Sequence, residues 1–354
     1  MVDESKTDEA RDAMLWKALD GRKVQCELCG HACVIAAGKY GVCRVRQNVA
    51  GRLKTLNYRA VVALNVDPIE KKPLFHFLPG SKSLSIAAPG CNFQCEFCQN
   101  WQISQSPRDG GGVVGGQAVS PEQIVTAALN YDCASISYTY TEPTVFFELA
   151  YDTAKLARAR GVRNCFVSNG YLTPLAVRTI APYLDAINVD LKAFRDETYR
   201  RVMKASLAPV LEGLKSLVQA GVWVEITTLI VPGMNDSPEE LRDIAGFIAR
   251  DLNPAVPWHV SRFHGDYKMA RVPGTPVETL QRACRIGMEA GLKFVYCGNV
   301  PGLADERTHC PNCREMLVDR TGFTVRGVYL KAGACPKCGT AIEGVWDKAI
   351  ATSD

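Results

Sequence analysis

The chain has 354 residues, of which 47% are hydrophobic and 22% charged, with a formal net charge of +4. This hydrophobic content excludes a disordered chain, and the small net charge gives no argument for a nucleic-acid or membrane partner. No stretch reaches the roughly 18–20 consecutive apolar residues of a membrane span, so we expect a soluble protein without a membrane partner. The charged N-terminus lacks an apolar signal region, which favours a cytoplasmic location.

The residue spacing at the start of the chain predicts a short amphipathic helix over residues 1–20. Met14, Leu15 and Leu19 fall on one face of that helix, as expected for packing against a core. Residues 21–82 follow as a cysteine-rich segment with short strand-like runs. We therefore expect a small N-terminal unit ahead of the main domain.

The segment 21–82 contains the first group of the 15 cysteines. Without a signal region the compartment is expected to be reducing, where disulfides are rare and clustered thiols usually bind metal. The group has the pattern C-x2-C-x3-C-x9-C, at Cys26, Cys29, Cys33 and Cys43, with His31 between them. Structural zinc is the first interpretation, an auxiliary iron–sulfur cluster the second, and reduced buried thiols the third.

Residues 83–304 alternate between short apolar runs and helical stretches. The runs are 84–88, 135–140, 164–167, 186–190, 223–231, 259–262 and 293–296. Ser120-Pro121, Thr173-Pro174 and Ser237-Pro238 each place an N-cap residue before a proline, as at the start of a helix. This alternation predicts an α/β fold with parallel strands, either a barrel or a doubly wound sheet. The functional face is then expected at the C-terminal ends of the strands.

A second cysteine group follows the first of these strands, in the pattern C-x3-C-x2-C at Cys91, Cys95 and Cys98. Three neighbouring thiolates can bind three irons of a [4Fe–4S] cluster and leave the fourth iron open to a small molecule. The next cysteine, Cys133, lies far along the chain. The alternative is a chance cluster of loop or core thiols, which this spacing and position disfavour.

This cysteine motif after the first strand of a βα domain resembles the radical S-adenosylmethionine (SAM) superfamily. The resemblance implies a partial (βα)6 TIM-type barrel, with small cysteine-rich metal-binding segments at both ends. It implies that the open iron binds SAM and that an electron from a reductant such as flavodoxin or ferredoxin cleaves it. The resulting 5′-deoxyadenosyl radical would abstract hydrogen from a substrate that the sequence does not reveal.

The same resemblance implies further SAM-binding positions at the strand ends. They are Phe97, Glu142, Ser168, Asn169, Asp190 and Lys192. In this comparison Glu142 accepts from the amino group of SAM, 168–169 contact the ribose and Phe97 packs beside the adenine. Asp190 and Lys192 resemble the Asp-Leu-Lys of glycyl-radical-activating enzymes. On the residues alone, Glu142 also fits an acidic helix start, and Asp190 with Lys192 fits a surface pair.

Two more features of the barrel region are similar to this superfamily. Residues 229–236 resemble a loop on the adenine side of SAM, although the pattern also fits a plain turn and N-cap. His259 and His264 flank the sixth predicted strand, near the place of a substrate-side histidine. The resemblance does not decide between the two histidines.

Within the superfamily the chain is most similar to the radical SAM component of the AmmeMemoRadiSam system, which resembles pyruvate formate-lyase-activating enzyme. The residues that carry this similarity are 67–77, 98–101, 183–192 and 261–267. The resemblance extends over roughly residues 21–345. It implies AMMECR-type and Memo-type proteins as partners.

Residues 305–354 carry a third cysteine group in the pattern C-x2-C-x21-C-x2-C, at Cys310, Cys313, Cys335 and Cys338. Two such knuckles can place four thiolates around one tetrahedral ion, so we expect a structural zinc ribbon, with rubredoxin-type iron or free thiols as alternatives. The remaining cysteines lie in helical or strand patterns and are expected to be small core residues. They are Cys133, Cys165, Cys284 and Cys297.

The sequence leaves three rival functions open. The first is an activase for a glycyl radical enzyme, and the second is an iron–sulfur electron-transfer protein that does not use SAM. The third is a nucleic-acid modifier that uses the zinc ribbon for recognition, although the basic residues of that segment form no dense patch. The residues do not distinguish a peptide, a metabolite or a base as substrate.

Overall fold

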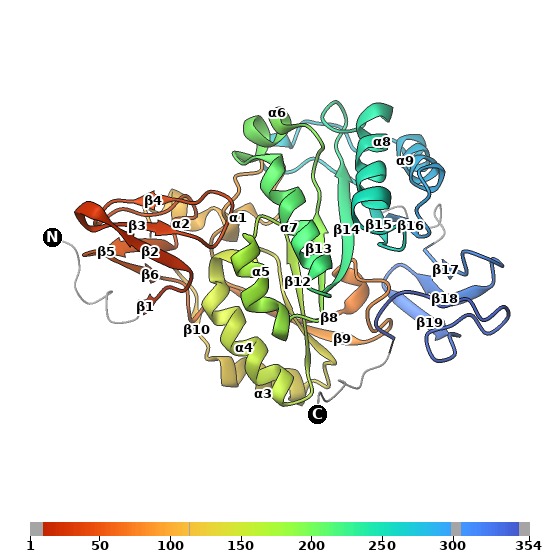
Figure 1. Cartoon of the computed structure of the whole chain (residues 1–354), viewed down its shortest axis with the longest axis horizontal. Coiled ribbons are helices and arrows are strands. Elements are labelled where there is room, and N and C mark those ends of the chain that lie inside the picture. Colours follow the sequence, from red (N-terminus) through yellow and green to blue (C-terminus); the bar gives the residue numbers. More distant parts are fainter. Residues whose placement is uncertain (1–9, 113, 299–305, 347–354) are drawn as a thin grey trace.

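In the computed structural model, residues 10–112, 114–298 and 306–346 are described, and the fold is built around an eight-stranded sheet with the order β16-β15-β14-β13-β12-β11-β9-β8 (Figure 1). All neighbours from β9 to β16 are parallel, and β8 pairs antiparallel with β9. The strands are β8 (Ala63–Pro68), β9 (Lys82–Ala87), β11 (Ser135–Tyr138), β12 (Arg163–Ser168), β13 (Ala186–Asp190), β14 (Trp223–Ile230), β15 (Trp258–Arg262) and β16 (Val295–Gly298).

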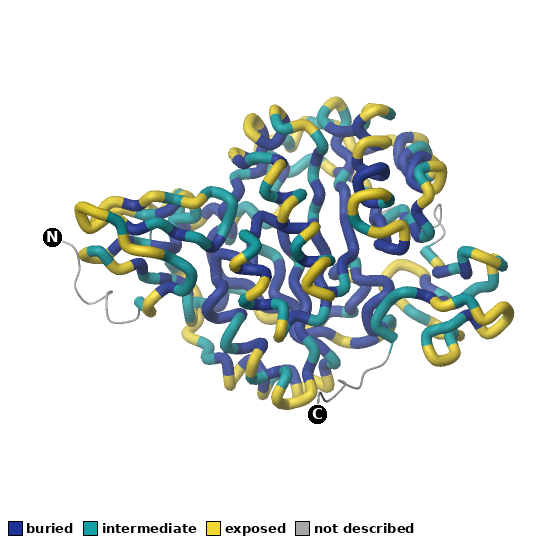
Figure 2. Tube along the Cα trace, in the orientation of Figure 1, coloured by how far each residue is buried: buried dark blue, intermediate teal, exposed yellow. Residues whose placement is uncertain are grey.

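Helices connect the parallel strands and cover the outer face of the sheet (Figure 1). The main ones are α3 (Pro121–Asn130), α4 (Phe147–Ala159), α5 (Pro174–Ile180), α7 (Leu207–Gln219), α8 (Pro238–Phe247) and α9 (Val277–Glu289). Ser120, Thr173 and Ser237 accept the expected N-cap hydrogen bonds, so the predicted helix starts are confirmed. The strands form the buried centre of the molecule (Figure 2). The α/β fold with a parallel sheet is confirmed, with β16 in addition to six parallel strands.

The helix predicted for residues 1–20 is wrong where the structure describes it, from residue 10 onward. Trp16–Leu19 forms β2, which pairs with β3 (Lys23–Cys26) across a turn in which Gly21 has a φ of 68°. Pairing of β2 with β3 along all four residues outweighs the helical spacing of the apolar residues. Residues 1–9 of that prediction lie outside the described residues.

Two small sheets make up this N-terminal unit. One contains β2, β3 and β4 (Val34–Ile35), and the other contains β1 (Arg11–Asp12), β6 (Arg52–Thr55) and β5 (Arg46–Val49). A two-stranded sheet of β7 (Ala60–Val61) and β10 (Gln117–Ala118) joins the unit to the main domain. The expected domain boundary after residue 82 falls at the start of β9, which pairs with β8, so it does not separate two units of the fold.

The C-terminal segment forms a separate three-stranded antiparallel sheet beside the barrel (Figure 1). Its strands are β17 (Thr308–His309), β18 (Met316–Thr321) and β19 (Thr324–Val328). The segment packs on the main domain through a cluster that includes Phe75, Phe294 and Cys310. The short remaining helices are α1 (Trp101–Ser104), α2 (Ser106–Asp109) and α6 (Asp196–Thr198).

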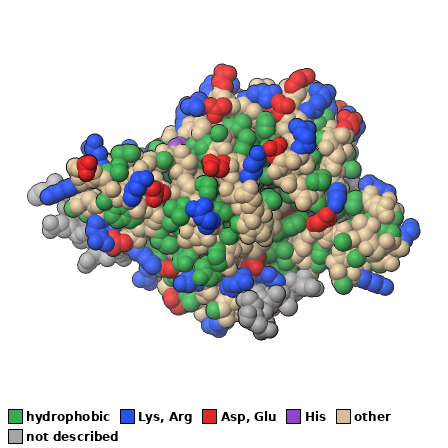
Figure 3. Space-filling view, viewed as in Figure 1, with side chains coloured by type: hydrophobic (Ala, Val, Ile, Leu, Met, Phe, Trp, Pro, Cys, Tyr) green, Lys and Arg blue, Asp and Glu red, His purple; other side chains and the backbone are tan. Residues whose placement is uncertain are grey.

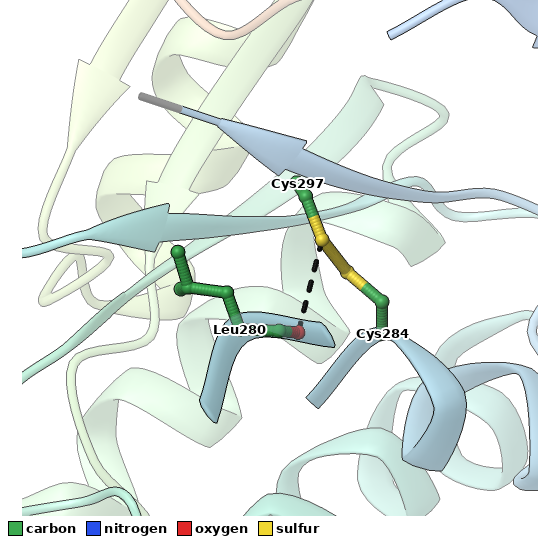
Figure 4. The surroundings of a disulfide bond; sticks show 3 residues. All are labelled: Leu280, Cys284 and Cys297. Atoms are coloured by element: carbon green, nitrogen blue, oxygen red, sulfur yellow. Dashed lines mark hydrogen bonds between the residues drawn. A yellow bond between two sulfur atoms is a disulfide. The ribbon is translucent and has the colours of Figure 1, made fainter. Parts of the chain in front are cut away.

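A disulfide joins Cys284 of α9 to Cys297 of β16 (Figure 4). The prediction that these two cysteines are separate core residues is therefore wrong. The chain returns from α9 to β16 so that the two sulfur atoms meet, which the spacing of the residues alone does not reveal. Cys133 and Cys165 are buried free thiols, as expected.

No helix in the described part of the chain is both long and apolar enough to cross a membrane. On the face shown in Figure 3, lysine and arginine side chains are interspersed with acidic ones. This face therefore presents no single block of positive charge of the kind that binds a nucleic-acid backbone.

Candidate functional site

A cavity of about 570 Å³ opens at the C-terminal ends of the parallel strands. Each of the strands β11 to β15, or the residues directly after it, contributes side chains to its wall, as does the cysteine loop that follows β9. Of the predicted adenine-side loop 229–236, only Leu229 lines this cavity. The three residues that the sequence assigned to the central cluster and the six that it assigned individually to SAM all line it. They are Cys91, Cys95, Phe97, Cys98, Glu142, Ser168, Asn169, Asp190 and Lys192.

The cysteine loop is held in place by backbone hydrogen bonds to the segment Tyr199–Met203. Gln94 N–H donates to the carbonyl of Met203 over 2.9 Å, and Glu96 N–H donates to that of Val202 over 3.2 Å. The Phe93 N–H also points at Cys91 Sγ, 3.3 Å away. The loop therefore presents its thiols from a fixed backbone.

The three thiols of the loop are not packed as tightly as the ligands of a single ion. Among the described residues, only the C-terminal cysteine group brings three or more donor atoms of His, Cys, Asp or Glu within 4.8 Å of one another. An iron–sulfur cube binds each thiolate through a different iron, so its ligand sulfurs stand farther apart. No described cysteine other than Cys91, Cys95 and Cys98 lines the cavity, so a cube would keep one iron without a protein thiolate.

Glu142 is buried at the end of β11 and is fixed by neighbours on β12 and in its own turn. Its Oε1 accepts from Thr144 N–H (3.0 Å), Thr144 Oγ1 (2.6 Å) and Ser168 Oγ (2.8 Å), whereas Oε2 accepts only from Asn169 N–H (2.8 Å) among the described residues. Burial raises the pKa of Glu142, and these hydrogen bonds act in the opposite direction. Oε2 therefore retains capacity to accept from a cationic ligand.

The turn after β12 needs a glycine at position 170. Gly170 has a φ of 72°, and a Cβ there would lie 2.6 Å from Val189 Cγ1. This tight turn brings the Asn169 side chain back over the cysteine loop, where its Nδ2 donates to Asn92 Oδ1 over 2.7 Å. The end of β12 is thus tied directly to the loop that carries Cys91, and Glu142 at the end of β11 is tied to it through Asn169.

Asp190 and Lys192 form an ion pair of 2.7 Å in the wall of the cavity. Burial disfavours the charge on Lys192, but Asp190 and the Cys95 thiol outweigh that effect and raise its pKa. The Lys192 ammonium also lies 5.9 Å from the ring centre of Phe97. These groups line the cavity together, so the alternative of an isolated surface pair is not supported.

Sequence reasoning missed a charged group in the wall of the same cavity, to which Lys71 and Lys72 contribute. Lys72, which is 2% exposed, donates to Asp67 over 2.6 Å, and Tyr140 OH donates to the same carboxylate. Burial by itself would raise the pKa of Asp67, yet these hydrogen bonds lower it. Asp67 and Lys72 lie in the stretch 67–77 that carries the subfamily resemblance, which is the signal that could have found them.

The structure separates the two candidate histidines. His259 is buried on β15, donates to Glu225 Oε2 over 2.7 Å and does not line the cavity. His264 accepts from Gln99 Nε2 over 2.9 Å, and Gln99 lines the cavity. The structure therefore favours His264 over His259 as the histidine beside the cavity, because His259 is buried against Glu225.

The four C-terminal cysteines converge on one point. Their sulfur atoms all lie within 4.8 Å of one another, and Cys310–Cys338 and Cys313–Cys335 are both 3.6 Å apart. Tetrahedral zinc with bonds of about 2.3 Å requires sulfur separations of about 3.8 Å. The group therefore fits a closed site for a single ion, with no position left for a substrate.

Comparisons with known proteins agree with this geometry. Residues 85–248 match the model of the radical SAM superfamily. An uncharacterized protein of Methanocaldococcus jannaschii is 45% identical over 335 residues, which cover 94% of this chain and 99% of that protein.

Two activating enzymes are more distant relatives. Pyruvate formate-lyase-activating enzyme of Clostridium pasteurianum is 23% identical over 61% of this chain and 91% of that enzyme. Benzylsuccinate synthase activating enzyme of Thauera aromatica is 25% identical over 54% of this chain and 63% of that enzyme. The parallel α/β sheet, the cysteine loop after β9 and the family match lead to one conclusion: the chain is an enzyme of the radical SAM superfamily.

Proposed function

We propose that this enzyme uses Cys91, Cys95 and Cys98 to hold a [4Fe–4S] cluster and cleaves SAM reductively. When bound and reduced, such a cluster supplies the electron that converts SAM to a 5′-deoxyadenosyl radical, which abstracts hydrogen from the substrate. The observation that carries the proposal is the gathering of three thiols and six predicted SAM contacts in one cavity. Superfamily membership itself implies both cofactors.

The remaining wall residues have distinct roles in this proposal. Glu142 Oε2 accepts from the SAM amino group, and Ser168 with Asn169 positions the ribose. Asp190 and Lys192 contact the polar end of the ligand, while Phe97 packs beside the adenine. Because these groups are fixed by hydrogen bonds within the chain, SAM would enter a site that needs little rearrangement.

The direct test is anaerobic reconstitution with iron and sulfide, reduction with dithionite and chromatography for 5′-deoxyadenosine after addition of SAM. We expect formation of 5′-deoxyadenosine and a change in the EPR spectrum of the reduced cluster on SAM binding. A well-formed cluster whose spectrum ignores SAM, with no cleavage, would favour an electron-transfer protein instead.

Replacing Glu142 with glutamine should weaken SAM binding without removing the cluster. The variant loses the negative charge that faces the amino group, and a charged hydrogen bond contributes about 1.5–3 kcal/mol, so affinity should fall roughly 10- to 100-fold. The measurement is the SAM concentration that gives half of the EPR change. Glu96→Gln is the matched control, since Glu96 lies in the cysteine loop but does not line the cavity.

For the Glu142→Gln variant, the EPR spectrum without SAM should match that of the unaltered enzyme. Unchanged SAM affinity in a variant with that spectrum would remove Glu142 from the proposed site. A lost cluster signal would instead mean that Glu142 supports the loop around Cys91 and not SAM.

A second candidate function is the activation of a glycyl radical enzyme. Two relatives bear names of activating enzymes, at 23% and 25% identity. The appearance of a glycine-centred EPR signal in a co-encoded glycyl radical enzyme would support this candidate. The resemblance to the AmmeMemoRadiSam system instead implies AMMECR-type and Memo-type proteins as partners. Co-purification of such proteins with the enzyme tests this.

The proposal also includes a cytoplasmic one-electron donor of the flavodoxin or ferredoxin type, and a structural zinc in the C-terminal segment.

Changing Cys335 to serine should lower the zinc content by about one ion per chain, because one of four tetrahedral ligands is lost. The midpoint of thermal unfolding should fall too, since Cys335 is buried in the cluster that packs this segment against the barrel. Elemental analysis measures the zinc content, and calorimetry measures the midpoint of thermal unfolding.

Cys133→Ser is the control for the zinc experiment, because Cys133 is buried but outside the three cysteine groups. A Cys335→Ser protein with undiminished zinc would place the ion elsewhere. Iron in place of zinc in the unaltered protein would identify a rubredoxin-type site.

A further inference from the structure

Two neighbouring lysines line the SAM cavity in addition to the residues assigned to SAM. Lys71 and Lys72 both contribute to the wall, and both donate to the Asp67 carboxylate, over 2.9 and 2.6 Å respectively. Lys72 is 2% exposed, whereas the Lys71 side chain is 46% exposed. This lysine pair is therefore anchored in the interior of the protein and reaches the cavity.

The lysine pair carries more positive charge than its partner neutralises. Two ammonium groups face one carboxylate, which also accepts from Tyr140 OH. Among the described residues, Asp67 is the only acid that forms an ion pair with either lysine. Each ammonium has three N–H donors and gives one to Asp67, so donors remain for a ligand.

The other charged side chains of the cavity wall do not offset this surplus. Asp190 pairs with Lys192, and Glu142 accepts from β12 and from its own turn. In the proposed function Glu142 also faces the amino group of SAM. The described part of the wall therefore has no acid left for the lysine pair, and a negatively charged ligand would balance it.

The lysine pair belongs to the edge of the large sheet, away from the strand ends assigned to SAM. Asp67 lies on the edge strand β8, and the strands β9, β11 and β12 separate β8 from β13, which ends at Asp190. Residues 64–66 of β8 are all exposed, so this edge is open to solvent. A ligand at the lysine pair would thus lie beside SAM and not in its place.

Tyr140 is held beside the lysine pair by an uncommon backbone conformation. Its φ of 62° lies in the left-handed region, which is costly for a bulky residue. In this conformation the hydroxyl donates to Asp67, and the ring centre lies 4.7 Å from the Lys72 ammonium. Asn65 Nδ2 also donates to the Tyr140 oxygen over 3.4 Å. Because such strain is found mainly at functional sites, it supports a binding role for this group.

We propose that Lys71 and Lys72 bind an oxyanion of the substrate, either a phosphate or a carboxylate, inside the SAM cavity. Such a group has oxygens for both ammonium groups at once, while Asp67 holds the two lysines side by side. The proposal gives the substrate a chemical class that the sequence left open. It rests on the proposed function only in treating the ligand as the substrate, because the anion site itself depends on the lysines.

The test measures the binding of inorganic phosphate and of acetate to the reconstituted, unreduced enzyme by titration calorimetry, with and without SAM. We expect the unaltered enzyme to bind at least one of these anions. Lys71→Gln should weaken that binding about 10-fold or more, because a charged hydrogen bond is lost, whereas Lys71→Arg should retain it. Lys82→Gln is the matched control, since Lys82 is exposed on β9 and does not line the cavity.

Binding of phosphate alone would indicate an organic phosphate as substrate, and binding of acetate a carboxylate. Failure of both anions to bind, or equal affinity in Lys71→Gln, would overturn the proposal. Anion binding that disappears once SAM is bound would assign the lysine pair to SAM and overturn it too. The titration without SAM needs neither reduction nor cleavage. An enzyme that binds phosphate but never cleaves SAM would therefore contradict only the proposed function, and one that cleaves SAM but binds neither anion would contradict only the anion site.

Discussion

Changing Cys95 to alanine should reduce the formation of 5′-deoxyadenosine from SAM to the rate seen without enzyme. Cys95 is buried, 8% exposed, in the middle of the loop, and its removal leaves two of the three thiolates that the proposed cluster needs. The protein has no nearby substitute, since no other described cysteine lines the cavity. Chromatography after anaerobic reconstitution measures the loss directly.

Cys133→Ala is the matched control for this experiment. Cys133 is likewise a buried free thiol, 5% exposed, so the same truncation tests whether alanine at a buried cysteine harms the enzyme in general. We expect this control to cleave SAM as the unaltered protein does. Cleavage that persists in Cys95→Ala would contradict the proposed ligand set, whereas loss in both variants would indicate a common effect on folding.

The residues that the sequence assigned to SAM lie at strand ends, and the structure brings them together in one cavity. Apolar runs such as 186–190 identify strands buried on both faces, and parallel strands bring their C-terminal ends to one edge. Polar residues that directly follow such runs must then meet. Glu142, Asn169 and Lys192 follow such runs and meet in one cavity, whereas their assignment to SAM came from the family resemblance.

The features that the sequence did not predict depend on contacts between segments that lie far apart in the chain. Asp67 and Tyr140 meet across 73 positions, and no local pattern pairs them. His259 is the second residue of β15, far from the strand end that faces the cavity, and it pairs with the buried Glu225. The Cys284–Cys297 disulfide also depends on the fold, because the chain must return from α9 to β16 before the two cysteines can meet.

Whether four cysteines converge on one point is likewise decided in three dimensions. The sequence offers two groups of four cysteines with similar short intervals, and both first suggested zinc. The structure distinguishes them, since the sulfur atoms of the group at Cys310 and Cys313 converge and those at Cys26 and Cys29 do not belong to a compact set. Spacing along the chain does not encode this difference, because the loops between the knuckles determine it.

Among the substitutions considered, the largest loss in the free energy of unfolding is expected at Glu225, on β14. Glu225 is 0% exposed and accepts four hydrogen bonds. The donors are Phe75 N–H (2.9 Å), His76 N–H (2.8 Å), Trp223 Nε1 (3.0 Å) and His259 Nε2 (2.7 Å). This one carboxylate thus fastens the segment before β9 to the interior of the sheet.

Glu225→Gln preserves the shape of the side chain but places an amide NH2 opposite donors that need an acceptor. We expect the free energy of unfolding to fall by about 3–5 kcal/mol, the usual cost of removing one partner from a buried charged group. Urea denaturation followed by tryptophan fluorescence measures the change. Glu197→Gln, at an exposed position on α6, is the control and should shift stability by less than about 0.5 kcal/mol.

The pH dependence of stability provides a second readout of the same variant. Burial would raise the pKa of Glu225, but the interactions with His259 and His76 reverse this and lower the pKa below its ordinary value of 4.5. The stability from the ionised carboxylate is therefore fully present above pH 4.5 and is lost as pH falls through the lower folded value. Glu225→Gln should lack this acid-sensitive component, and an unchanged acid profile would show that the carboxylate is not what fastens the segment.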